Sequence, residues 1–317
     1  MDLNSRILVL GHRGFIGSAI LRRLYLFGYN HVFGASRSEI DLENDEAVKN
    51  FFPKSNPDYV FLCAGTVGGI NQNQLFPADF IFSNLAIQLN TLRHAHIHGI
   101  KKFILFASSC IYPRHINDPM AETAILSGLL EPTSMPYAVS KLAGLQMCLA
   151  LNKQYNSCRF IPVIPNSVYG PNDNFDPESS HVLSALMHRI YQAKKCGDDT
   201  VLIWGTGTPK REFIYVDDVA DAAIQLMCLK DIPDGPFNIG VGSDISIIDL
   251  AHMLASVIGY RGKFVFDHSK PDGSPRKLLD STKINNTGWI PKIMLEEGIL
   301  RTFEWYMSHQ QTGCSAC

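Results

Sequence analysis

The feature that most constrains this chain is a glycine-rich turn close to its N-terminus. The turn follows an apolar run at residues 6–10, which predicts a buried strand, and precedes a helical pattern at residues 18–24. Glycines spaced in this way allow a tight turn, close approach of the backbone to a pyrophosphate, and close packing of helix on strand. Between a strand and a helix, the pattern predicts a dinucleotide-binding site. Its candidate residues are Gly11, His12, Arg13, Gly14, Phe15, Ile16 and Gly17.

Strand-like and helix-like segments alternate through the first half of the chain. Apolar runs at residues 31–36, 58–65 and 101–107 predict further strands, and longer patterns at 78–99 and 137–155 predict helices. We therefore expect an α/β fold: a Rossmann-like, doubly wound parallel sheet that forms an NADP-binding domain over residues 1–165. Strands at 201–204 and 264–266, with helices at 217–229 and 246–258, predict a smaller C-terminal α/β substrate-binding region over 166–317. Some of its segments are expected to return to the sheet.

The overall composition limits the partners that this chain can have. It has 317 residues, of which 46% are hydrophobic and 18% charged, with a formal net charge of -2 at pH 7. This balance gives no basis for nucleic acid or a membrane surface as the main partner. No apolar run approaches the roughly 20 residues of a bilayer span, and the N-terminus lacks the apolar core of a signal peptide. We therefore expect a cytoplasmic protein.

Neither the cysteines nor the histidines form a pattern that predicts a metal site. The eight cysteines are scattered, which favours reduced thiols over a disulfide framework. Cys314 and Cys317 form a single C-x-x-C pair in the C-terminal tail, which is weak evidence for zinc or redox chemistry. His94, His96 and His98 alternate by two, a spacing that does not place three side chains on one helix face. We interpret them as a solvated helix end and expect no metal.

An arginine follows the second predicted strand, at the point where the residue type distinguishes the two nicotinamide cofactors. An acidic residue there binds the ribose 2′-hydroxyl of NAD, whereas an arginine suits the 2′-phosphate of NADP. Arg37 stands at this point, and Arg13 in the glycine-rich turn adds a second positive charge. We expect NADP(H); the alternative is that both arginines are solvated surface residues. Asp41 and Leu42 then open a polar helix that reaches the adenine end.

Three residues of the predicted sheet and its neighbouring helix form a candidate hydride-transfer site. Ser108 follows the strand at 101–107, and ligands bind at the carboxyl ends of strands in such sheets. Tyr137 and Lys141 are four residues apart and share a helix face. An ammonium group beside a phenol favours the phenolate and lowers its pKa, which makes the tyrosine a usable acid or base. Ser108 supplies a hydrogen bond to a substrate carbonyl.

Further motifs extend this interpretation across nearly the whole chain. The glycine-rich turn, Ser108 and the Tyr-x-x-x-Lys pair resemble the pattern of extended short-chain dehydrogenases/reductases. Within that superfamily the chain resembles the GDP-L-fucose synthase family, the 3,5-epimerase/4-reductases of GDP-4-keto-6-deoxy-D-mannose. The closer resemblance is carried by Gly-His-Arg-Gly (11–14), Val-Gly-Gly-Ile (67–70), Ser-Ser-Cys-Ile-Tyr-Pro (108–113), Tyr-Gly-Pro-Asn-Asp-Asn-Phe (169–175), Ser-His-Val (180–182), Trp-Gly-Thr-Gly-Thr-Pro-Lys-Arg-Glu-Phe (204–213) and Lys-Pro-Asp-Gly-Ser-Pro-Arg-Lys-Leu-Leu-Asp (270–280).

The resemblance implies roles for particular residues and a GDP-sugar as substrate. Cys110 and His181 would be the acid/base pair of epimerisation, beside the catalytic Ser108, Tyr137 and Lys141. It also implies a homodimer packed through the helices at 79–98 and 137–155. Beyond the glycine-rich turn, the implied cofactor contacts are Arg37, Asp41, Leu42, Ala64, Ala107, Lys141, Pro165, Val168 and His181. The implied substrate contacts are Ser109, Ser167, Val182, Arg189, Trp204, Arg211 and Asp280.

Two positions depart from the family pattern and leave the sugar open. Thr66 stands where the family usually has lysine before Val-Gly-Gly, and Ser167 stands where it favours asparagine, with Asn166 one step earlier. The alternative is therefore a related nucleotide-sugar epimerase or reductase acting on a dideoxyhexose or a heptose. A dehydratase would want a carboxylate near Ser108, and none is present there. A cofactor-binding regulatory protein without catalysis is disfavoured by the intact serine, tyrosine and lysine.

Overall fold

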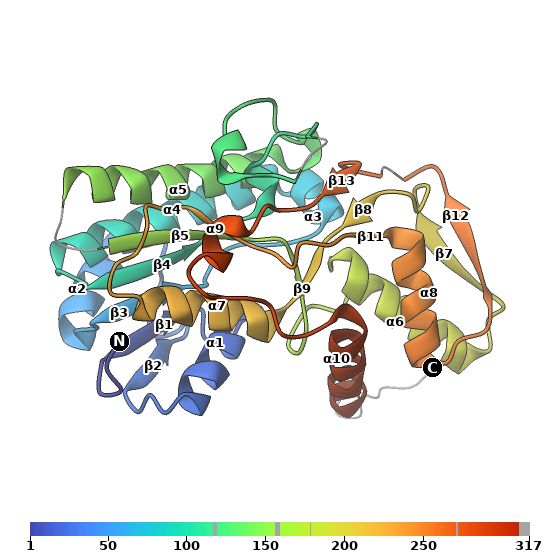
Figure 1. The fold of residues 1–317 in the computed structure, drawn as a ribbon, viewed down its shortest axis with the longest axis horizontal. Helices are drawn as coiled ribbons and strands as arrows, with labels where there is room; N and C mark the ends of the chain where they lie inside the picture. Colours follow the sequence, from blue (N-terminus) through green and yellow to red (C-terminus); the bar gives the residue numbers. More distant parts are fainter. Residues whose placement is uncertain (117–118, 156–158, 178, 271, 311–317) are drawn as a thin grey trace.

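Short apolar strands assemble into one parallel sheet (Figure 1). The computed structural model describes residues 1–116, 119–155, 159–177, 179–270 and 272–310. The strand order is β10-β5-β4-β3-β1-β2, and each neighbouring pair is parallel. These strands are β1 (Ile7–Leu10), β2 (Val32–Ala35), β3 (Tyr59–Leu62), β4 (Lys102–Phe106), β5 (Arg159–Pro165) and β10 (Phe237–Ile239). The predicted Rossmann-like, doubly wound fold is confirmed.

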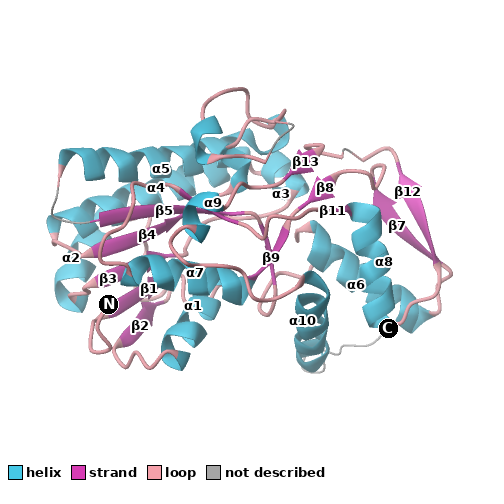
Figure 2. Cartoon of the chain, in the orientation of Figure 1, coloured by secondary structure: helices cyan, strands magenta, loops and turns pink. Residues whose placement is uncertain are grey.

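The sheet is buried on both faces because side chains alternate along each strand. In β1, Ile7 and Val9 pack into one core with α1 (Phe15–Leu26) and α7 (Val216–Cys228). Leu8 and Leu10 pack into the opposite core with α2 (Asp45–Ser55), α4 (Pro77–Ile97) and α5 (Met135–Gln154). Figure 2 shows these helical layers on the two sides of the sheet.

The helix after β2 begins later than the sequence predicts. The prediction places its start at Asp41, whereas α2 begins at Asp45 because Asn44 is its N-cap. The Asn44 side chain accepts a hydrogen bond from the Ala47 N–H at 3.0 Å, which satisfies a free donor of the first turn. Asp41 lies in the preceding turn and accepts a hydrogen bond from the Glu43 N–H at 3.0 Å.

Beyond β5, the chain alternates between the sheet and a second core. This core is formed by α6 (Val182–Cys196), α8 (Ile247–Ile258), α10 (Leu295–Gln310) and the parallel pair β7 (Thr200–Trp204) and β12 (Lys263–Asp267). β6 (Ser167–Tyr169) pairs with β9 (Phe213–Tyr215), and β8 (Lys210–Arg211) pairs with both β11 (Ile245–Ser246) and β13 (Arg276–Lys277). Shorter elements are α3 (Ile70–Leu75), α9 (Thr282–Asn285) and 3-10 helices at Ser109–Ile111, Glu122–Ala124 and Pro132–Ser134. β10 and α7 bring this part of the chain back to the sheet.

The histidines near the end of α4 differ from one another in environment. His94 is buried, and its Nε2 lies 2.8 Å from Asp45 Oδ1. The His96 ring lies against Tyr155, and His98 is exposed. The prediction of a solvated helix end is therefore wrong for His94, because α4 packs against α2 there.

Neither a metal-binding cluster nor a membrane-spanning helix is found in the part of the chain that the structure describes. There, no group of three or more histidine, cysteine or acidic residues is placed to hold a metal ion. Across the same residues, none of the helices combines the length and apolar character needed to cross a bilayer. Cys314 and Cys317 lie outside the described residues.

Candidate active site

The glycine-rich turn joins β1 to α1 at the point where the strand order of the sheet reverses. Gly11 has a φ of +83°, a conformation that side chains rarely adopt. A methyl group on Gly17 would lie 2.1 Å from the Gly11 carbonyl oxygen, so this close packing requires glycine. Gly14, the N-cap of α1, provides no side-chain cap for the first N–H groups of the helix. Free N–H groups at a helix N-terminus fit the pyrophosphate of a dinucleotide.

The loop after β2 gathers groups that suit an anion. The Arg37 side chain is 85% exposed and lies 3.5 Å from the Glu43 carboxylate. Glu39 accepts hydrogen bonds from the Ser36 N–H at 2.7 Å and hydroxyl at 2.6 Å. Those hydrogen bonds hold the pKa of Glu39 below its usual range, and the nearby Arg13 charge adds to the effect. The Glu39 carboxylate is therefore stabilised in its ionised form at the tip of β2.

Three other expected cofactor residues lie at the carboxyl edge of the sheet, and a fourth lies just beyond it in β6. Ala64 follows β3, Ala107 follows β4, Pro165 ends β5, and Val168 lies in β6. Ala64 approaches the glycine-rich turn so closely that a methyl group on Gly11 would lie 2.7 Å from the Ala64 nitrogen. The carboxyl ends of the strands thus form one continuous border, where ligands bind in folds of this type.

The expected hydride-transfer residues converge at the end of β4. Ser108 lies two residues after the end of β4, and its hydroxyl interacts with the phenol of Tyr137, which lies in the first turn of α5. Lys141 lies one turn further along and is buried. Its Nζ donates a hydrogen bond to the Phe106 carbonyl at 3.1 Å and lies 5.8 Å from the centre of the Tyr137 ring.

The protonation of this group differs from the expectation that Lys141 lowers the pKa of Tyr137. Burial raises the pKa of Tyr137, the nearby Cys110 adds to the rise, and the hydrogen bond with Ser108 opposes it. Burial also lowers the pKa of Lys141, to about 8. The expectation fails because burial disfavours the charged form of both groups. At neutral pH, Tyr137 therefore keeps its proton and is available as an acid.

Cys110 has a charged neighbour for which the sequence predicts no role. Lys277 of β13 donates a hydrogen bond from its Nζ to the Cys110 Sγ at 3.5 Å. Burial raises the pKa of the thiol, but the Lys277 charge and hydrogen bonds with Ser108, Lys277 and Ser134 outweigh it, so the pKa lies below its ordinary value. In contrast, burial raises the pKa of the Cys63 thiol. The thiolate therefore forms more readily at Cys110 than at Cys63.

His181 lies at the N-cap of α6, and Val182 is the first residue of that helix. The His181 side chain is exposed, and its charge interacts with Asp173. Burial raises the pKa of Asp173, whereas His181 and a hydrogen bond from the Ser184 hydroxyl lower it. Among the described residues, no hydrogen bond joins His181 to Cys110.

Positive and aromatic side chains form the other end of the candidate site. Arg189 lies over the Trp204 ring at 5.3 Å from its centre, and Lys270 lies over the same ring at 5.2 Å. Arg211 donates a hydrogen bond to the Asp272 carbonyl oxygen at 3.4 Å. Burial lowers the pKa of Arg211, and the nearby Cys110 and Asp272 oppose that change. Arg211 therefore lies between the region of Trp204 and the thiol.

One expected substrate residue lies apart from this group. The Asp280 carboxylate accepts a hydrogen bond from the Thr282 N–H at 2.9 Å, and Asp280 lines a different hollow together with Pro119. Asp272, earlier in the same segment, contacts Arg211 through its carbonyl oxygen, and its carboxylate accepts hydrogen bonds from the Thr206 N–H at 2.8 Å and hydroxyl at 2.9 Å.

The two departures from the family pattern occupy different places. The Thr66 hydroxyl donates a hydrogen bond to the Ser83 hydroxyl at 3.0 Å, beside the end of β3. Ser167 begins β6 and pairs with β9. Its predecessor Asn166 accepts a hydrogen bond from the Ser109 hydroxyl at 3.1 Å. Asn166 therefore contacts the turn that carries Cys110, a link that the sequence does not reveal.

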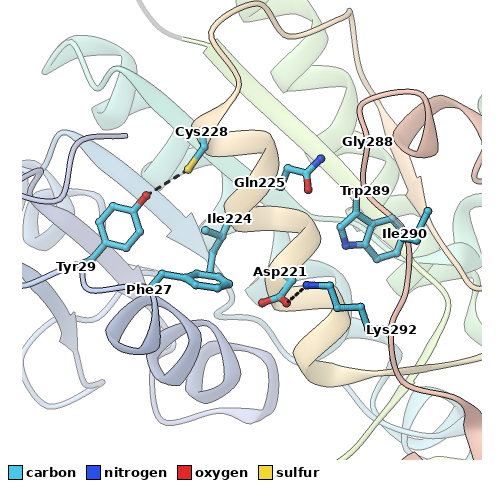
Figure 3. A pocket seen from close by; sticks show the side chains of 10 residues that line it. All are labelled: Phe27, Tyr29, Asp221, Ile224, Gln225, Cys228, Gly288, Trp289, Ile290 and Lys292. Atoms are coloured by element: carbon cyan, nitrogen blue, oxygen red, sulfur yellow. Dashed lines mark hydrogen bonds and ion pairs between the residues drawn. The ribbon is translucent and has the colours of Figure 1, made fainter.

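A separate hollow of about 370 Å³ lies at the C-terminal end of α1, away from the glycine-rich turn (Figure 3). Phe27 and Tyr29 line it from one side, and Trp289 lines it from the other. Asp221 of α7 faces it and lies 3.7 Å from the Lys292 Nζ. None of the site residues expected from the sequence lines this hollow.

The fold and the site define the class of protein. Residues 7–240, well over half of the chain, match the model of the "NAD dependent epimerase/dehydratase family". "GDP-L-fucose synthase 1" of Arabidopsis thaliana is 45% identical over 310 residues, which cover 97% of this chain and 95% of the relative. Within the epimerase/dehydratase class, the chain belongs to the GDP-L-fucose synthase family, as the sequence motifs indicate.

Solved structures agree with this assignment. A GDP-L-fucose synthetase from Naegleria fowleri bound to NADP has a TM-score of 0.90 at 27% identity, with 98% of this chain and 97% of that chain covered. A GDP-6-OMe-4-keto-L-xylo-heptose reductase from C. jejuni has a TM-score of 0.90 at 35% identity, with 98% and 99% covered. The chain therefore shares its fold with an NADP-bound GDP-L-fucose synthetase and with a reductase of a GDP-linked heptose.

Proposed function

We propose that the protein catalyses the NADPH-dependent 3,5-epimerisation and 4-reduction of GDP-4-keto-6-deoxy-D-mannose to GDP-L-fucose. The observation that carries the proposal is the thiol of Cys110, which Lys277 activates beside Ser108 and Tyr137. Reduction alone requires Ser108, Tyr137 and Lys141. A thiolate next to them adds a base for removing a proton from carbon.

In the epimerisation, the hydrogens on C3 and C5 are acidic because the carbanion delocalises into the C4 carbonyl as an enolate. Ser108 and Tyr137 donate hydrogen bonds to the oxygen on which the negative charge develops. Cys110 and His181 act on opposite faces of the sugar ring, so that one removes the proton and the other returns one. The stereochemistry at each carbon inverts, and the proton count is unchanged.

In the reduction, Tyr137 donates its proton to the C4 oxygen as the ketone becomes an alcohol. Burial supports this role, because it keeps the phenol protonated at neutral pH. The nicotinamide cofactor, when bound, supplies the hydride. Lys141, placed one turn from Tyr137, would help to hold the nicotinamide ribose and would stabilise the tyrosinate that remains.

The preference for NADPH and the binding of GDP follow from the positive side chains. Arg37 and Arg13 would hold the 2′-phosphate near the tip of β2, where the Glu39 carboxylate already finds donors. Arg189 and Arg211 would hold the diphosphate of the substrate. Asp41, Leu42 and the glycine-rich turn would complete the cofactor site.

We further propose a cytoplasmic homodimer that forms through α4 and α5. These helices expose large apolar side chains, among them Phe82 at 72% and Leu89 at 52%. Val139 on α5 is also exposed. Apolar side chains in this number on two adjacent helices suit a contact between two copies of the chain.

A second candidate is the reduction of a GDP-4-keto-heptose. It is favoured by the departures at Thr66 and Ser167 and by the likeness to the C. jejuni reductase at 35% identity. Both candidates use the same catalytic residues, and they differ in the sugar that the site admits.

The test is incubation with GDP-4-keto-6-deoxymannose and NADPH in deuterium oxide, followed by NMR of the product. We expect GDP-L-fucose labelled at C3 and C5. A reduced product without deuterium contradicts the epimerase step, and absence of NADPH oxidation contradicts the reductase step. Cys110→Ser should abolish deuterium uptake and leave the Kd for NADPH unchanged. Turnover of a GDP-4-keto-heptose in preference to the deoxymannose would favour the second candidate.

A further inference from the structure

A buried carboxylate links the two sides of the proposed active site. Glu212 lies between β8 and β9 and has no exposed surface. Its Oε1 accepts hydrogen bonds from the Val241 and Gly242 N–H groups at 2.7 and 2.8 Å. Its Oε2 accepts from Asn166 Nδ2 at 2.7 Å and from the Leu279 N–H at 3.0 Å. Burial raises the pKa of Glu212 above its ordinary value, although these four donors oppose the rise because they stabilise the ionised carboxylate.

One arm of this network reaches the turn that carries the thiol. Asn166 donates to Glu212 through its Nδ2 and accepts through its Oδ1 from the Ser109 hydroxyl, at 3.1 Å. Asn166 and Ser109 are both buried, so water does not replace their hydrogen bonds at low cost. Ser109 precedes Cys110 in a 3-10 helix. The orientation of the Asn166 amide therefore fixes the backbone next to the sulfur.

The other arm reaches the strand that carries the activating lysine. Glu212 donates its own N–H to the Lys277 carbonyl at 3.1 Å, and its Oε2 holds the N–H of Leu279, two residues further on. Asn166 Nδ2 also lies 3.3 Å from the Lys277 carbonyl oxygen. Glu212 and Asn166 thus hold the chain at the carbonyl of Lys277 and two residues beyond it, and the Lys277 Nζ contacts the Cys110 Sγ.

We infer that Glu212 is a positioning residue, which sets the separation between the Lys277 ammonium and the Cys110 sulfur. The attraction between an ammonium and a thiolate falls with distance, so a displaced Lys277 stabilises the thiolate less. The expected effect of Glu212 on catalysis rests on the proposed function, whereas its expected effect on the ionisation of the Cys110 thiol does not. The backbone is shaped around this carboxylate, since a methyl group on Gly240 would lie 2.5 Å from Glu212 Oε1.

The substitution Glu212→Gln keeps the size of the side chain but leaves only one oxygen to accept hydrogen bonds from the four donors. An amide offers one acceptor oxygen, so its NH2 group faces either the Val241 and Gly242 pair or the Asn166 and Leu279 pair, donor against donor. Facing the Asn166 and Leu279 pair, the NH2 group breaks both arms directly; facing the Val241 and Gly242 pair, it displaces the side chain from which both arms start. Asn166→Ala serves as a second variant, because it cuts the arm to Ser109 and leaves the other three donors in place.

The test measures the Cys110 thiol directly and then its catalytic use. Alkylation of the full-length protein by iodoacetamide is followed against pH, with mass spectrometry of the peptide that contains Cys110. In Glu212→Gln and Asn166→Ala we expect the apparent pKa of Cys110 to rise by about one pH unit. Solvent-deuterium exchange into the substrate should fall about 100-fold, the loss typical of a misplacement of about 1 Å, while the Kd for NADPH stays within about twofold.

The matched control is Asp218→Asn in α7. Asp218 is also buried and accepts two backbone hydrogen bonds, from the Lys292 N–H at 3.1 Å and the Ile293 N–H at 2.9 Å. We expect this variant to lose stability and to keep the alkylation profile of Cys110.

The outcomes separate the two proposals. An unchanged Cys110 profile in both site variants, or the same change in Asp218→Asn, overturns the positioning role. Should Glu212→Gln fail to fold, Asn166→Ala decides by the same readouts. If the unaltered protein takes up no deuterium while the variants still shift the Cys110 profile, the positioning role stands and the epimerase proposal falls.

Discussion

Lys141 is a buried cation, and replacing it with methionine should make the protein more stable and inactive. Burial lowers the pKa of Lys141 from its ordinary value of 10.5 to about 8. The folded protein therefore binds this proton more weakly than the unfolded chain does. At about 1.36 kcal/mol for each pH unit, the charged lysine lowers the free energy of unfolding at pH 7 by about 3 kcal/mol.

The effect has a defined dependence on pH. Between pH 8 and 10.5 the unfolded chain holds the proton and the folded protein does not, so this contribution to stability rises with pH and the penalty disappears above 10.5. Methionine removes the penalty and leaves the Phe106 carbonyl without the Nζ donor, a loss of about 1 kcal/mol. The net expectation at pH 7 is a gain of about 2 kcal/mol for Lys141→Met, at the expense of reduction.

Urea unfolding of the cofactor-free protein, followed by circular dichroism, measures the free energy of unfolding at pH 7 and at pH 10.5. Lys153→Met is the control, because Lys153 is exposed near the end of the same helix. We expect its free energy of unfolding to stay within about 0.5 kcal/mol of the unaltered protein. A Lys141→Met variant that is no more stable at pH 7, or equally stabilised at both pH values, would refute the reasoning.

Three further substitutions test other parts of the structure. Gly17→Ala places a methyl group against the Gly11 carbonyl, so the Kd for NADPH by fluorescence titration should rise at least about tenfold; an unchanged value contradicts the proposed pyrophosphate site. Arg37→Ala should weaken NADPH binding by roughly 10- to 100-fold and leave NADH binding intact, whereas equal losses would remove Arg37 from the 2′-phosphate. Asp221→Asn removes the charge and one of the two oxygens that Arg23 binds at 2.5 and 2.7 Å, so it should lower the free energy of unfolding by about 2 kcal/mol; an unchanged melting temperature would contradict a stabilising ion pair.

The parts of the fold that local patterns encode could be predicted from the sequence. The strand, the glycine-rich turn and the helix at residues 6–24 are contiguous, so one stretch carries both the geometry and the cofactor site. The family motifs likewise place Ser108 and Tyr137 at the end of β4, where the structure brings them together. The start of α2 was harder to predict, because Asp41 and Asn44 are both good caps and the choice between them depends on tertiary packing.

The parts of the site that depend on long-range contacts could not be predicted. Lys277 reaches Cys110 only through the pairing of β13 with β8, and Glu212 meets Asn166 only where β6 and β9 run side by side. The protonation of Tyr137 has the same origin: its burial arises from several segments, whereas the spacing to Lys141 is local. Sequence spacing therefore predicts which groups react, but it does not predict whether those groups are protonated.

The edge strand β10 has a consequence for the order of events during synthesis. β10 pairs with β5 but is encoded at residues 237–239, and α7 packs against α1 from residues 216–228. The ribosome must therefore release about three quarters of the chain before the nucleotide-binding sheet is closed. Until then the edge of β5 and one apolar face of the sheet are open to wrong partners. We expect nascent chains that stop before α7 to depend on chaperones, and those that extend past β10 to acquire protease resistance.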